Sequence, residues 1–257
     1  MNIKYIIAAG LLAFTVTTRA QNKQENMKFQ EETLHLTTEW DKVFPQSDKV
    51  NHSKVTFHNR YGVTLAADLY MPKGMTGKLP AIAVCGPFGA VKEQASGLYA
   101  QELAKRGFLA IAFDPSFTGE SGGLPRYVAS PDINTEDFCA AVDYLSTRDD
   151  VNPEQIGILG ICGWGGMAVN AAAIDTRVKA TVAATMYDMS RVNAKGYFDA
   201  ADNADARHEL RKQLNAQRTA DYREGSYELA GGLPEVVPAD APQFLKDYFA
   251  YYKTERG

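Results

Sequence analysis

The chain has 257 residues, of which 45% are hydrophobic and 23% are charged, and its formal net charge is −4. This length is sufficient for one domain with a full hydrophobic core, and the composition excludes a disordered or fibrous protein. The slightly acidic balance offers no bulk attraction to nucleic acid or to an anionic membrane, so neither is expected as a partner.

The first twenty residues have the pattern of a secretory signal peptide. Lys4 supplies a positive start, residues 5–16 are apolar, and Thr18 and Ala20 are the small residues before the cleavage point. The apolar run is short for a membrane span, and no cysteine follows it as a lipid attachment site. We therefore expect residues 1–20 to be cleaved and the protein to be exported to a bacterial periplasm. The alternative is an uncleaved N-terminal anchor.

The next part of the chain contains the first predicted strands. Residues 21–50 are polar without a strong period and are expected to form an N-terminal arm. Residues 54–59 and 63–70 alternate between apolar and polar side chains around a turn, which predicts an antiparallel hairpin. Residues 79–85 and 108–113 are nearly continuous apolar runs, typical of strands that are buried on both faces.

Two helices are predicted from apolar residues that recur at helical spacing. The first spans residues 92–106, and the second begins near Asn134, whose side chain can cap its first turn. The side chains expected to face inward are Leu98, Tyr99 and Leu103 in the first helix and Phe138, Ala141, Val142 and Leu145 in the second.

A further strand, helix and strand are predicted at residues 155–160, 163–174 and 178–184. Strands that alternate with helices predict an α/β fold, with a mostly parallel sheet in three α/β/α layers, opened by the antiparallel hairpin. The core domain is then expected at residues 51–184. Residues 185–257 show helical stretches without a convincing strand, and we expect them to form a helical cap-like insert.

The turn Gly160-Ile161-Cys162-Gly163-Trp164-Gly165-Gly166 carries the strongest chemical signal. It places a cysteine between a buried strand and a helix of small residues, which is the context of a nucleophile elbow. Because such a turn is strained, its neighbours must lack bulky side chains, as the glycines do. Amides at the start of a helix favour a thiolate and stabilise an oxyanion.

We predict from this turn that Cys162 is the catalytic nucleophile and that the Gly163 amide is one oxyanion-hole donor. The second donor is predicted to be the amide of Phe88, in the loop after the strand at residues 79–85, because that loop and the turn leave adjacent strands in the usual sheet order. The alternative for Cys162 is a buried, inert thiol at a strand end.

Three segments, in this order and spacing, carry a family resemblance: residues 86–94 (Gly-Pro-Phe-Gly-Ala-Val-Lys-Glu-Gln), residues 112–123 (Ala-Phe-Asp-Pro-Ser-Phe-Thr-Gly-Glu-Ser-Gly-Gly) and residues 160–166. Over residues 50–257 the chain resembles the dienelactone-hydrolase-related branch of the α/β-hydrolase superfamily. The resemblance implies an α/β-hydrolase fold and a small-molecule ester, lactone or amide substrate. It also implies a Cys or Ser nucleophile, with an Asp and a His later in the chain.

The chain departs from the family pattern in two places. Trp164 stands where a small residue is usual, and it would crowd the pocket or shift the helix start. His208 is the only histidine after Cys162, and it lies among charged residues, so the expected Asp and His are not found. We therefore expect the last strands of the fold to be missing, which would leave a sheet edge exposed for oligomerisation.

Weaker candidates and rival functions remain. Glu93 is a possible partner of the thiol, Cys85 a redox partner, and His208, Asp188 or Asp199 a base or acid. No HExxH, CxxC or histidine cluster occurs, so no metal and no cofactor is expected, and three cysteines predict no disulfide framework. The first hypothesis is an ester or lactone hydrolase. The alternatives are a truncated non-catalytic remnant that binds a small molecule, and a redox protein.

Overall fold

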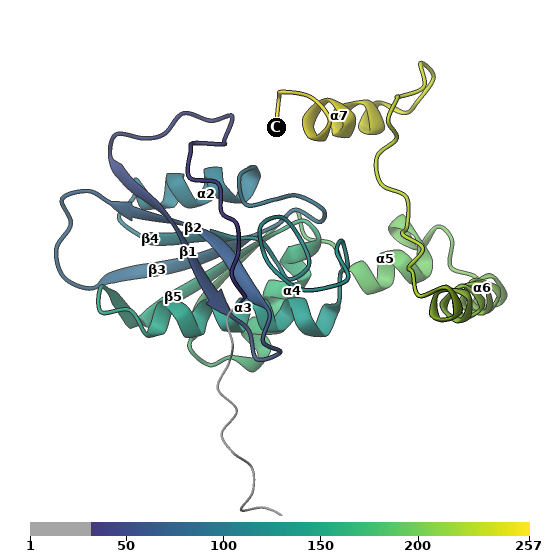
Figure 1. Cartoon of the computed structure of the whole chain (residues 1–257), viewed down its shortest axis with the longest axis horizontal. Helices are drawn as coiled ribbons and strands as arrows, with labels where there is room; N and C mark the ends of the chain where they lie inside the picture. Colours follow the sequence, from purple (N-terminus) through teal and green to yellow (C-terminus); the bar gives the residue numbers. More distant parts are fainter. Residues whose placement is uncertain (1–31) are drawn as a thin grey trace, which may run out of the picture. The chain divides into compact units, whose positions relative to one another are not determined.

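The computed structural model describes residues 32–257, and their core is a mixed six-stranded sheet with the order β1-β2-β4-β3-β5-β6 (Figure 1). The strands are β1 (Val50–His58), β2 (Thr64–Pro72), β3 (Leu79–Cys85), β4 (Leu109–Phe113), β5 (Val151–Ile161) and β6 (Val178–Ala184). β2 pairs antiparallel with β1 and with β4, and the other pairs are parallel. This confirms the predicted mostly parallel sheet with its opening hairpin.

Helices cover both faces of this sheet. α2 (Ala95–Ala104) packs on one face, where Ala100 belongs to a buried cluster with side chains of β2, β3, β4 and β5. α3 (Pro131–Ser146) and α4 (Gly163–Ile174) pack on the other face, where Phe138 lies in the larger core cluster. The arrangement is the predicted three-layer α/β/α fold.

After β6, the described chain forms helices and no further strand, as predicted for residues 185–257. These elements are α5 (Met189–Lys195), the 3-10 helix η1 (Tyr197–Asp199), α6 (Ala204–Glu224) and α7 (Gln243–Tyr252). β6 is the edge strand of the sheet, and most of its residues are exposed. Across residues 32–257, no helix is both long and apolar enough to span a membrane.

The inward face predicted for α2 is wrong in two of its three residues. Leu98 and Tyr99 are 42% and 43% exposed, whereas Leu103 packs against the core as predicted and Ala100 is fully buried. The helix lies too close to the sheet for larger side chains. A Cβ added at Gly97 would lie 3.1 Å from the hydroxyl of a buried tyrosine on β2.

This close packing predicts opposite outcomes for two substitutions on α2. Ala100→Leu is expected to lower the free energy of unfolding by about 1–3 kcal/mol, because the helix–sheet interface has no room for the added atoms. Leu98→Gln, at an exposed position, is expected to change it by less than about 0.5 kcal/mol. Urea denaturation measures both, and equal losses would contradict the orientation of α2.

The start of α3 also differs from the prediction. The helix begins at Pro131 with Ser130 as its N-cap residue, so Asn134 is not the cap. Asn134 is instead buried in the first turn, where its side chain accepts a hydrogen bond from the Ser130 amide (2.7 Å) and donates one to Asp137 (3.0 Å). The inward side chains are as predicted: Phe138, Ala141, Val142 and Leu145 are all buried.

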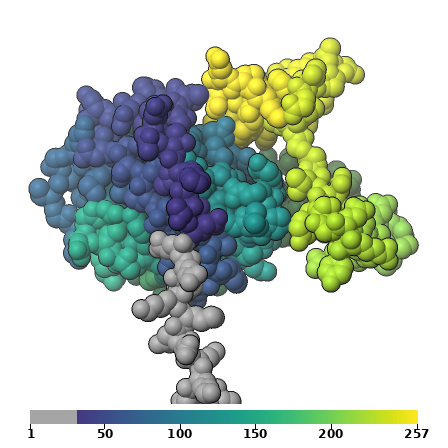
Figure 2. All heavy atoms as spheres, viewed as in Figure 1, coloured from purple at the N-terminus to yellow at the C-terminus, as the bar shows by residue number. Residues whose placement is uncertain are grey.

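The expected signal peptide, residues 1–20, lies outside the described residues, as does the first part of the arm. Residues 32–49 contain no helix or strand, yet they run over the surface of the core (Figure 2). Lys42 is buried there, and the Ser47 amide donates a hydrogen bond to the Gln101 side chain at 2.9 Å. This part of the arm is therefore packed on the domain through polar contacts.

Candidate active site

Strand β5 ends at Ile161 and helix α4 begins at Gly163, so Cys162 is the single residue that connects them. Its φ of 59° and ψ of −126° are unfavourable for a residue with a side chain, and such strain is concentrated at functional sites. Its carbonyl oxygen accepts hydrogen bonds from the amides of Gly165 (3.0 Å) and Tyr187 (3.2 Å). The strained turn is therefore held both by α4 and by the chain that follows β6.

Glycine is required around this turn for two separate structural reasons. A Cβ added at Gly160 would lie 2.2 Å from the carbonyl oxygen of Trp164, so the turn itself requires glycine at that position. At Gly163, an added Cβ would lie 3.1 Å from Met189, and Gly165 is similarly close to the segment after β6. The absence of a side chain at Gly163 and Gly165 therefore allows the segment after β6 to approach the start of α4.

The structure brings the loop after β3 against the start of α4. The Cβ of Phe88 lies 3.2 Å from the Cβ position of Gly163, and its ring stacks on Trp164 with centroids 6.5 Å apart. Glycine is needed at position 86, where φ is 113° and a Cβ would lie 2.4 Å from the Ile161 carbonyl oxygen. Within residues 32–257, neither the Phe88 nor the Gly163 amide donates to an acceptor. The two predicted oxyanion donors are therefore neighbours, and both are unengaged.

Trp164 neither shifts the helix, which starts at Gly163, nor lies in solvent. It is 4% exposed and belongs to the larger core cluster, and its indole nitrogen is buried without a hydrogen-bond partner in the described structure. Trp164 also lines a cavity of about 310 Å³ together with Phe88 and Arg126. The Arg126 guanidinium there donates to the carbonyl oxygens of Gly119 and Ser121.

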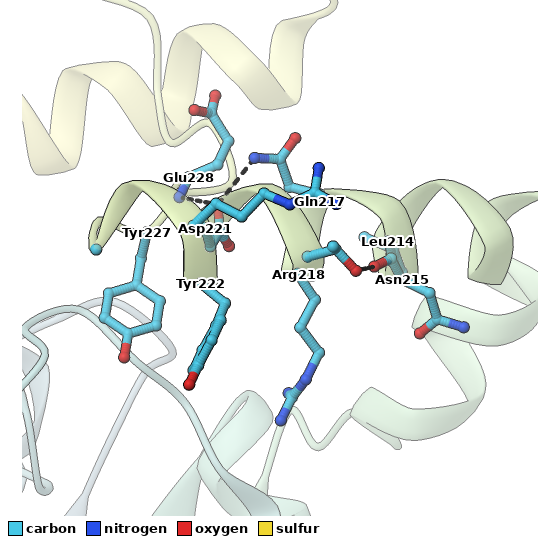
Figure 3. A pocket seen from close by; sticks show the side chains of 11 residues that line it. Leu214, Asn215, Gln217, Arg218, Asp221, Tyr222, Tyr227 and Glu228 are labelled. Carbon is cyan, nitrogen blue, oxygen red and sulfur yellow. Dashed lines mark hydrogen bonds between the residues drawn. The ribbon is translucent and has the colours of Figure 1, made fainter.

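A second cavity, of about 350 Å³, lies on the other side of Gly163 and is lined by three methionines. A larger cavity of about 1110 Å³ lies along α6, where Arg218, Tyr222 and Tyr227 project to one side (Figure 3). Asp221 in that region is engaged by Gln217 and by the amide of Glu228. Its lining contains no residue of the Cys162 turn or of the Phe88 loop, so the two smaller cavities define the candidate site.

Helix α7 contributes tyrosines that the sequence reasoning missed. Burial, together with neighbouring Tyr251 and Cys162, raises the pKa of Tyr252 to about 12. Burial also raises the pKa of Tyr248, and Tyr187 and Cys162 contribute to that shift. Cys162 therefore contributes to the electrostatic environment of both phenols. The signal that could have found them is the recurrence of aromatic residues at helical spacing in an otherwise polar segment.

Within residues 32–257, no histidine is seen hydrogen-bonded to Cys162. His52 and His58 lie on β1, four strand spacings from β5, which corresponds to about 19 Å. His52 is hydrogen-bonded to Asp68 at 2.8 Å. His35 and His208 are exposed, and His208 lies on the surface of α6, in agreement with the reading of it as a surface residue.

The weaker acidic candidates are engaged elsewhere. Glu93 contacts the ammonium of Lys54 at 3.3 Å, so its carboxylate is paired with a lysine rather than with the thiol. Asp188 caps the N-terminus of α5 by accepting a hydrogen bond from the Arg191 amide. Asp199 pairs with the guanidinium of the same arginine. All three are therefore structural in the described chain.

The three cysteines are free thiols in this structure. Cys85 is fully buried at the end of β3, and burial, reinforced by Asp137 and Asp114, raises the pKa of its thiol well above the ordinary value. A thiol that resists ionisation is a poor partner for disulfide exchange, which requires a thiolate. The redox interpretation of Cys85 with Cys162 is therefore weakly supported.

Buried charged side chains anchor the loop that contains Phe88 to the loop that follows β4. The Lys92 side chain is inaccessible to solvent, and its ammonium lies 2.9 Å from Asp114 and 2.7 Å from Glu120. The Lys92 amide donates to the second oxygen of Asp114 at 2.8 Å. Because Lys92 follows β3 and the two acids follow β4, these contacts tie the two loops together.

The same network extends to the arm and to β1. The Lys54 ammonium lies 3.1 Å from Asp41 and 2.8 Å from Glu120, and it also contacts Glu93. These three carboxylates approach one another within 4.8 Å, a spacing compatible with a metal ion, but Lys54 already lies among them. The acidic cluster is therefore neutralised by the protein itself.

Replacing Glu120 with glutamine is expected to reduce stability at neutral pH, with the loss shrinking as the pH falls. Although burial acts to raise it, hydrogen bonds from Lys54 and Lys92 lower the pKa of Glu120 from its ordinary 4.5 to about 2. A folded-state pKa below the unfolded value contributes stability above pH 4.5 that is lost as the pH falls toward 2. Urea denaturation between about pH 3 and pH 7 measures the difference. A constant difference would contradict this assignment.

Residues 61–230 match the family model described as X-Pro dipeptidyl-peptidase (S15 family). The chain is 56% identical over 255 residues to the uncharacterized protein PA2218 of Pseudomonas aeruginosa, covering 98% of this chain and 68% of that protein. The crystal structure of PA2218 aligns with a TM-score of 0.84 at 60% identity, covering 88% of this chain and 70% of that one.

Two further relatives are more distant. The uncharacterized protein YcjY of Escherichia coli is 37% identical over 210 residues, which cover 80% of this chain and 68% of YcjY. Thiohydrolase aneE of Aspergillus aculeatus is 33% identical over 133 residues, which cover 52% of this chain and 41% of that protein. The fungal similarity is therefore confined to about half of this chain.

Proposed function

This chain belongs to the X-Pro dipeptidyl-peptidase (S15) family of α/β hydrolases, and from that premise we propose that it cleaves small carboxylic esters, lactones or thioesters with Cys162 as nucleophile. The observation that carries the proposal is the pair of unengaged amides, of Gly163 and Phe88, beside a thiol on a strained turn. Such amides are the donors that an acyl-transfer oxyanion needs.

The proposed reaction has two acyl transfers. The Cys162 sulfur attacks the substrate carbonyl carbon, an S–C bond forms, and the carbonyl oxygen becomes an oxyanion that accepts hydrogen bonds from the two amides. Collapse of this intermediate breaks the bond to the leaving alcohol or thiol, which takes up from solvent the equivalent of the proton that the Cys162 thiol lost on attack. Water then attacks the enzyme thioester, releasing the acid and restoring the thiol.

Two features of the site bear on the choice between this proposal and a non-catalytic alternative. A helix N-terminus favours negative charge, and Cys162 is the N-cap residue of α4, so the position supports stabilisation of an oxyanion formed beside it. The Asp and His implied by the family resemblance are not identified among residues 32–257. That observation favours the alternative, a non-catalytic protein of the same fold that binds a small molecule beside Cys162.

Thioesters enter the proposal from a relative. The protein aneE is named a thiohydrolase, and its similarity extends over 133 residues of this chain. Thiolates are better leaving groups than alkoxides, because their conjugate acids are more acidic. A site that lacks a strong general acid is therefore better suited to thioesters than to alkyl esters.

Acyl-enzyme trapping tests the proposal directly. We expect p-nitrophenyl acetate to transfer one acetyl group to Cys162, detected by peptide mass spectrometry after rapid acid quench, and hydroxylamine to remove it. Turnover is then compared across a p-nitrophenyl ester, an acyl thioester, a lactone and an Xaa-Pro p-nitroanilide, the last because of the family description. Failure to acylate Cys162, with binding retained, would favour the non-catalytic alternative.

Two further proposals concern the chain as a whole. Residues 1–20 are proposed to direct export, which mass measurement of protein recovered from a bacterial periplasm would test by the loss of these residues. The exposed edge strand β6 supports self-association, because unpaired strand edges template pairing with another chain. Light scattering over a concentration series measures that association, and a constant monomer mass would contradict it.

A further inference from the structure

The cavity beside Gly163 gathers methionines from two parts of the chain. Met167 comes from α4, Met186 comes from the segment that links β6 to α5, and Met189 is the first residue of α5. Its volume is about 350 Å³. Methionine side chains are unbranched and polarizable, so a wall made of them adapts to apolar groups of different shapes.

This cavity begins at one of the two proposed oxyanion donors. A Cβ at Gly163 would lie 3.1 Å from both Cγ and Sδ of Met189, so the methionine side chain lies directly against the backbone of that residue. An acyl group attached to Cys162 with its oxygen at the Gly163 amide therefore has the methionine wall as a neighbour. Cys162 precedes the first turn of α4, and Gly163 and Gly166 of that turn line the cavity, so the acyl carbon lies next to the cavity wall.

The charged residue in the lining of this cavity, Asp188, already has a hydrogen-bond partner. Asp188 accepts a hydrogen bond from the Arg191 amide at 2.9 Å as the N-cap of α5, which directs its carboxylate to the helix end. The other cavity, on the Phe88 side, is lined by Arg126, whose guanidinium donates to the carbonyl oxygens of Gly119 and Ser121, and by no methionine. The three methionines therefore distinguish the Gly163 cavity as the one matched to an unbranched apolar chain.

We propose that the methionine-lined cavity is the acyl-chain pocket and that it selects unbranched aliphatic acyl groups. The volume of about 350 Å³ is sufficient for an acyl chain of several carbons. This assignment rests on the proposed function for the direction of the acyl chain, and it names the substrate class of that same site. It makes no use of a catalytic base.

The test uses the thiol as a reporter of occupancy. N-alkyl iodoacetamides alkylate Cys162 by forming an S–C bond and expelling iodide, while the thiol proton passes to the buffer. Full burial of one methylene corresponds to about a fourfold change in affinity, so the N-hexyl reagent is expected to react at least about tenfold faster than the N-methyl reagent. Rates are measured by mass spectrometry of the intact full chain. Equal rates for the two reagents would overturn the assignment.

A matched pair of substitutions on α4 sharpens the test. Asn170 lines the cavity and is exposed, so Asn170→Phe fills the pocket, and the hexyl-to-methyl rate ratio is expected to fall to about that of a small free thiol. Ala173→Phe adds the same ring at an exposed position outside the lining and is expected to keep the wild-type ratio. Retention of the full ratio in Asn170→Phe would also overturn the assignment.

A second measurement does not involve the thiol. In protein labelled with 13C-methyl methionine, 2-octanone is expected to shift the Met186 and Met189 methyl signals, whereas acetone at the same concentration leaves them in place. Signals are assigned with Met→Leu variants. Shifts without acylation of Cys162 by esters would reject the proposed hydrolase and retain the pocket, whereas acylation without shifts would do the reverse.

Discussion

Replacing Cys162 with alanine is expected to lower kcat/KM for a p-nitrophenyl ester or an acyl thioester by at least about 10³-fold, because no other group on the β5–α4 turn can form the acyl intermediate. The fold is expected to persist, since Cys162 is half-buried and alanine leaves its backbone contacts to Gly165 and Tyr187 in place. Steady-state kinetics on purified protein measure the loss.

Two controls make this result specific. Cys139→Ala removes a buried thiol from α3, away from the turn, and is expected to leave kcat/KM within a few-fold of the wild type. Circular dichroism and a thermal melt of Cys162→Ala exclude unfolding as the cause of lost activity. Equal rates for Cys162→Ala and the wild type would show that any hydrolysis occurs without this thiol and would reject the nucleophile assignment.

Replacing Lys92 with methionine is expected to lower the free energy of unfolding by about 3–5 kcal/mol, because it breaks a buried ion pair. Methionine approximates the length of the side chain but removes the charge that lies between Asp114 and Glu120. Because Asp114 is fully buried, the substitution leaves an uncompensated carboxylate in the core. Denaturant unfolding at neutral pH measures the loss.

The pH dependence identifies the buried carboxylate as the cause. Burial raises the pKa of Asp114 to about 6 even with Lys92 opposing the shift, so without the ammonium this carboxyl accepts a proton more readily still. The deficit of Lys92→Met is therefore expected to be largest above the raised pKa of Asp114 in the variant and to shrink as the pH falls toward 6. Asp114→Asn in the same background is expected to recover part of the stability.

An exposed ion pair provides the reference for this experiment. Arg106, just beyond the end of α2, pairs with Glu102 of that helix, and its guanidinium lies mostly in solvent. Arg106→Gln removes one positive charge, as Lys92→Met does, and is expected to cost less than about 1 kcal/mol. Comparable losses from the two substitutions would mean that the buried network does not hold the Phe88 and Asp114 loops together.

The sequence by itself determined the layers of the fold and the position of the central turn. Apolar runs of strand length, separated by helical periods, were sufficient to place β3 and β6 at their observed boundaries and α4 at residues 163–174. The glycines around Cys162 indicated a strained strand-to-helix connection, and the positive φ of Cys162 agrees with it. These features depend on local conformation and on simple burial, which a single stretch of chain encodes.

Only the tertiary structure decided which side of α2 faces the sheet and what surrounds Cys162. Leu98 is exposed because the helix approaches the sheet at a distance that admits only small residues such as Ala100, and this distance depends on residues far away in the chain. The methionine-lined cavity and the pairing of Lys92 with Asp114 arise in the same way. Each brings together groups widely separated in the sequence, and no local period records which partners will satisfy a buried charge or fill the space beside a turn.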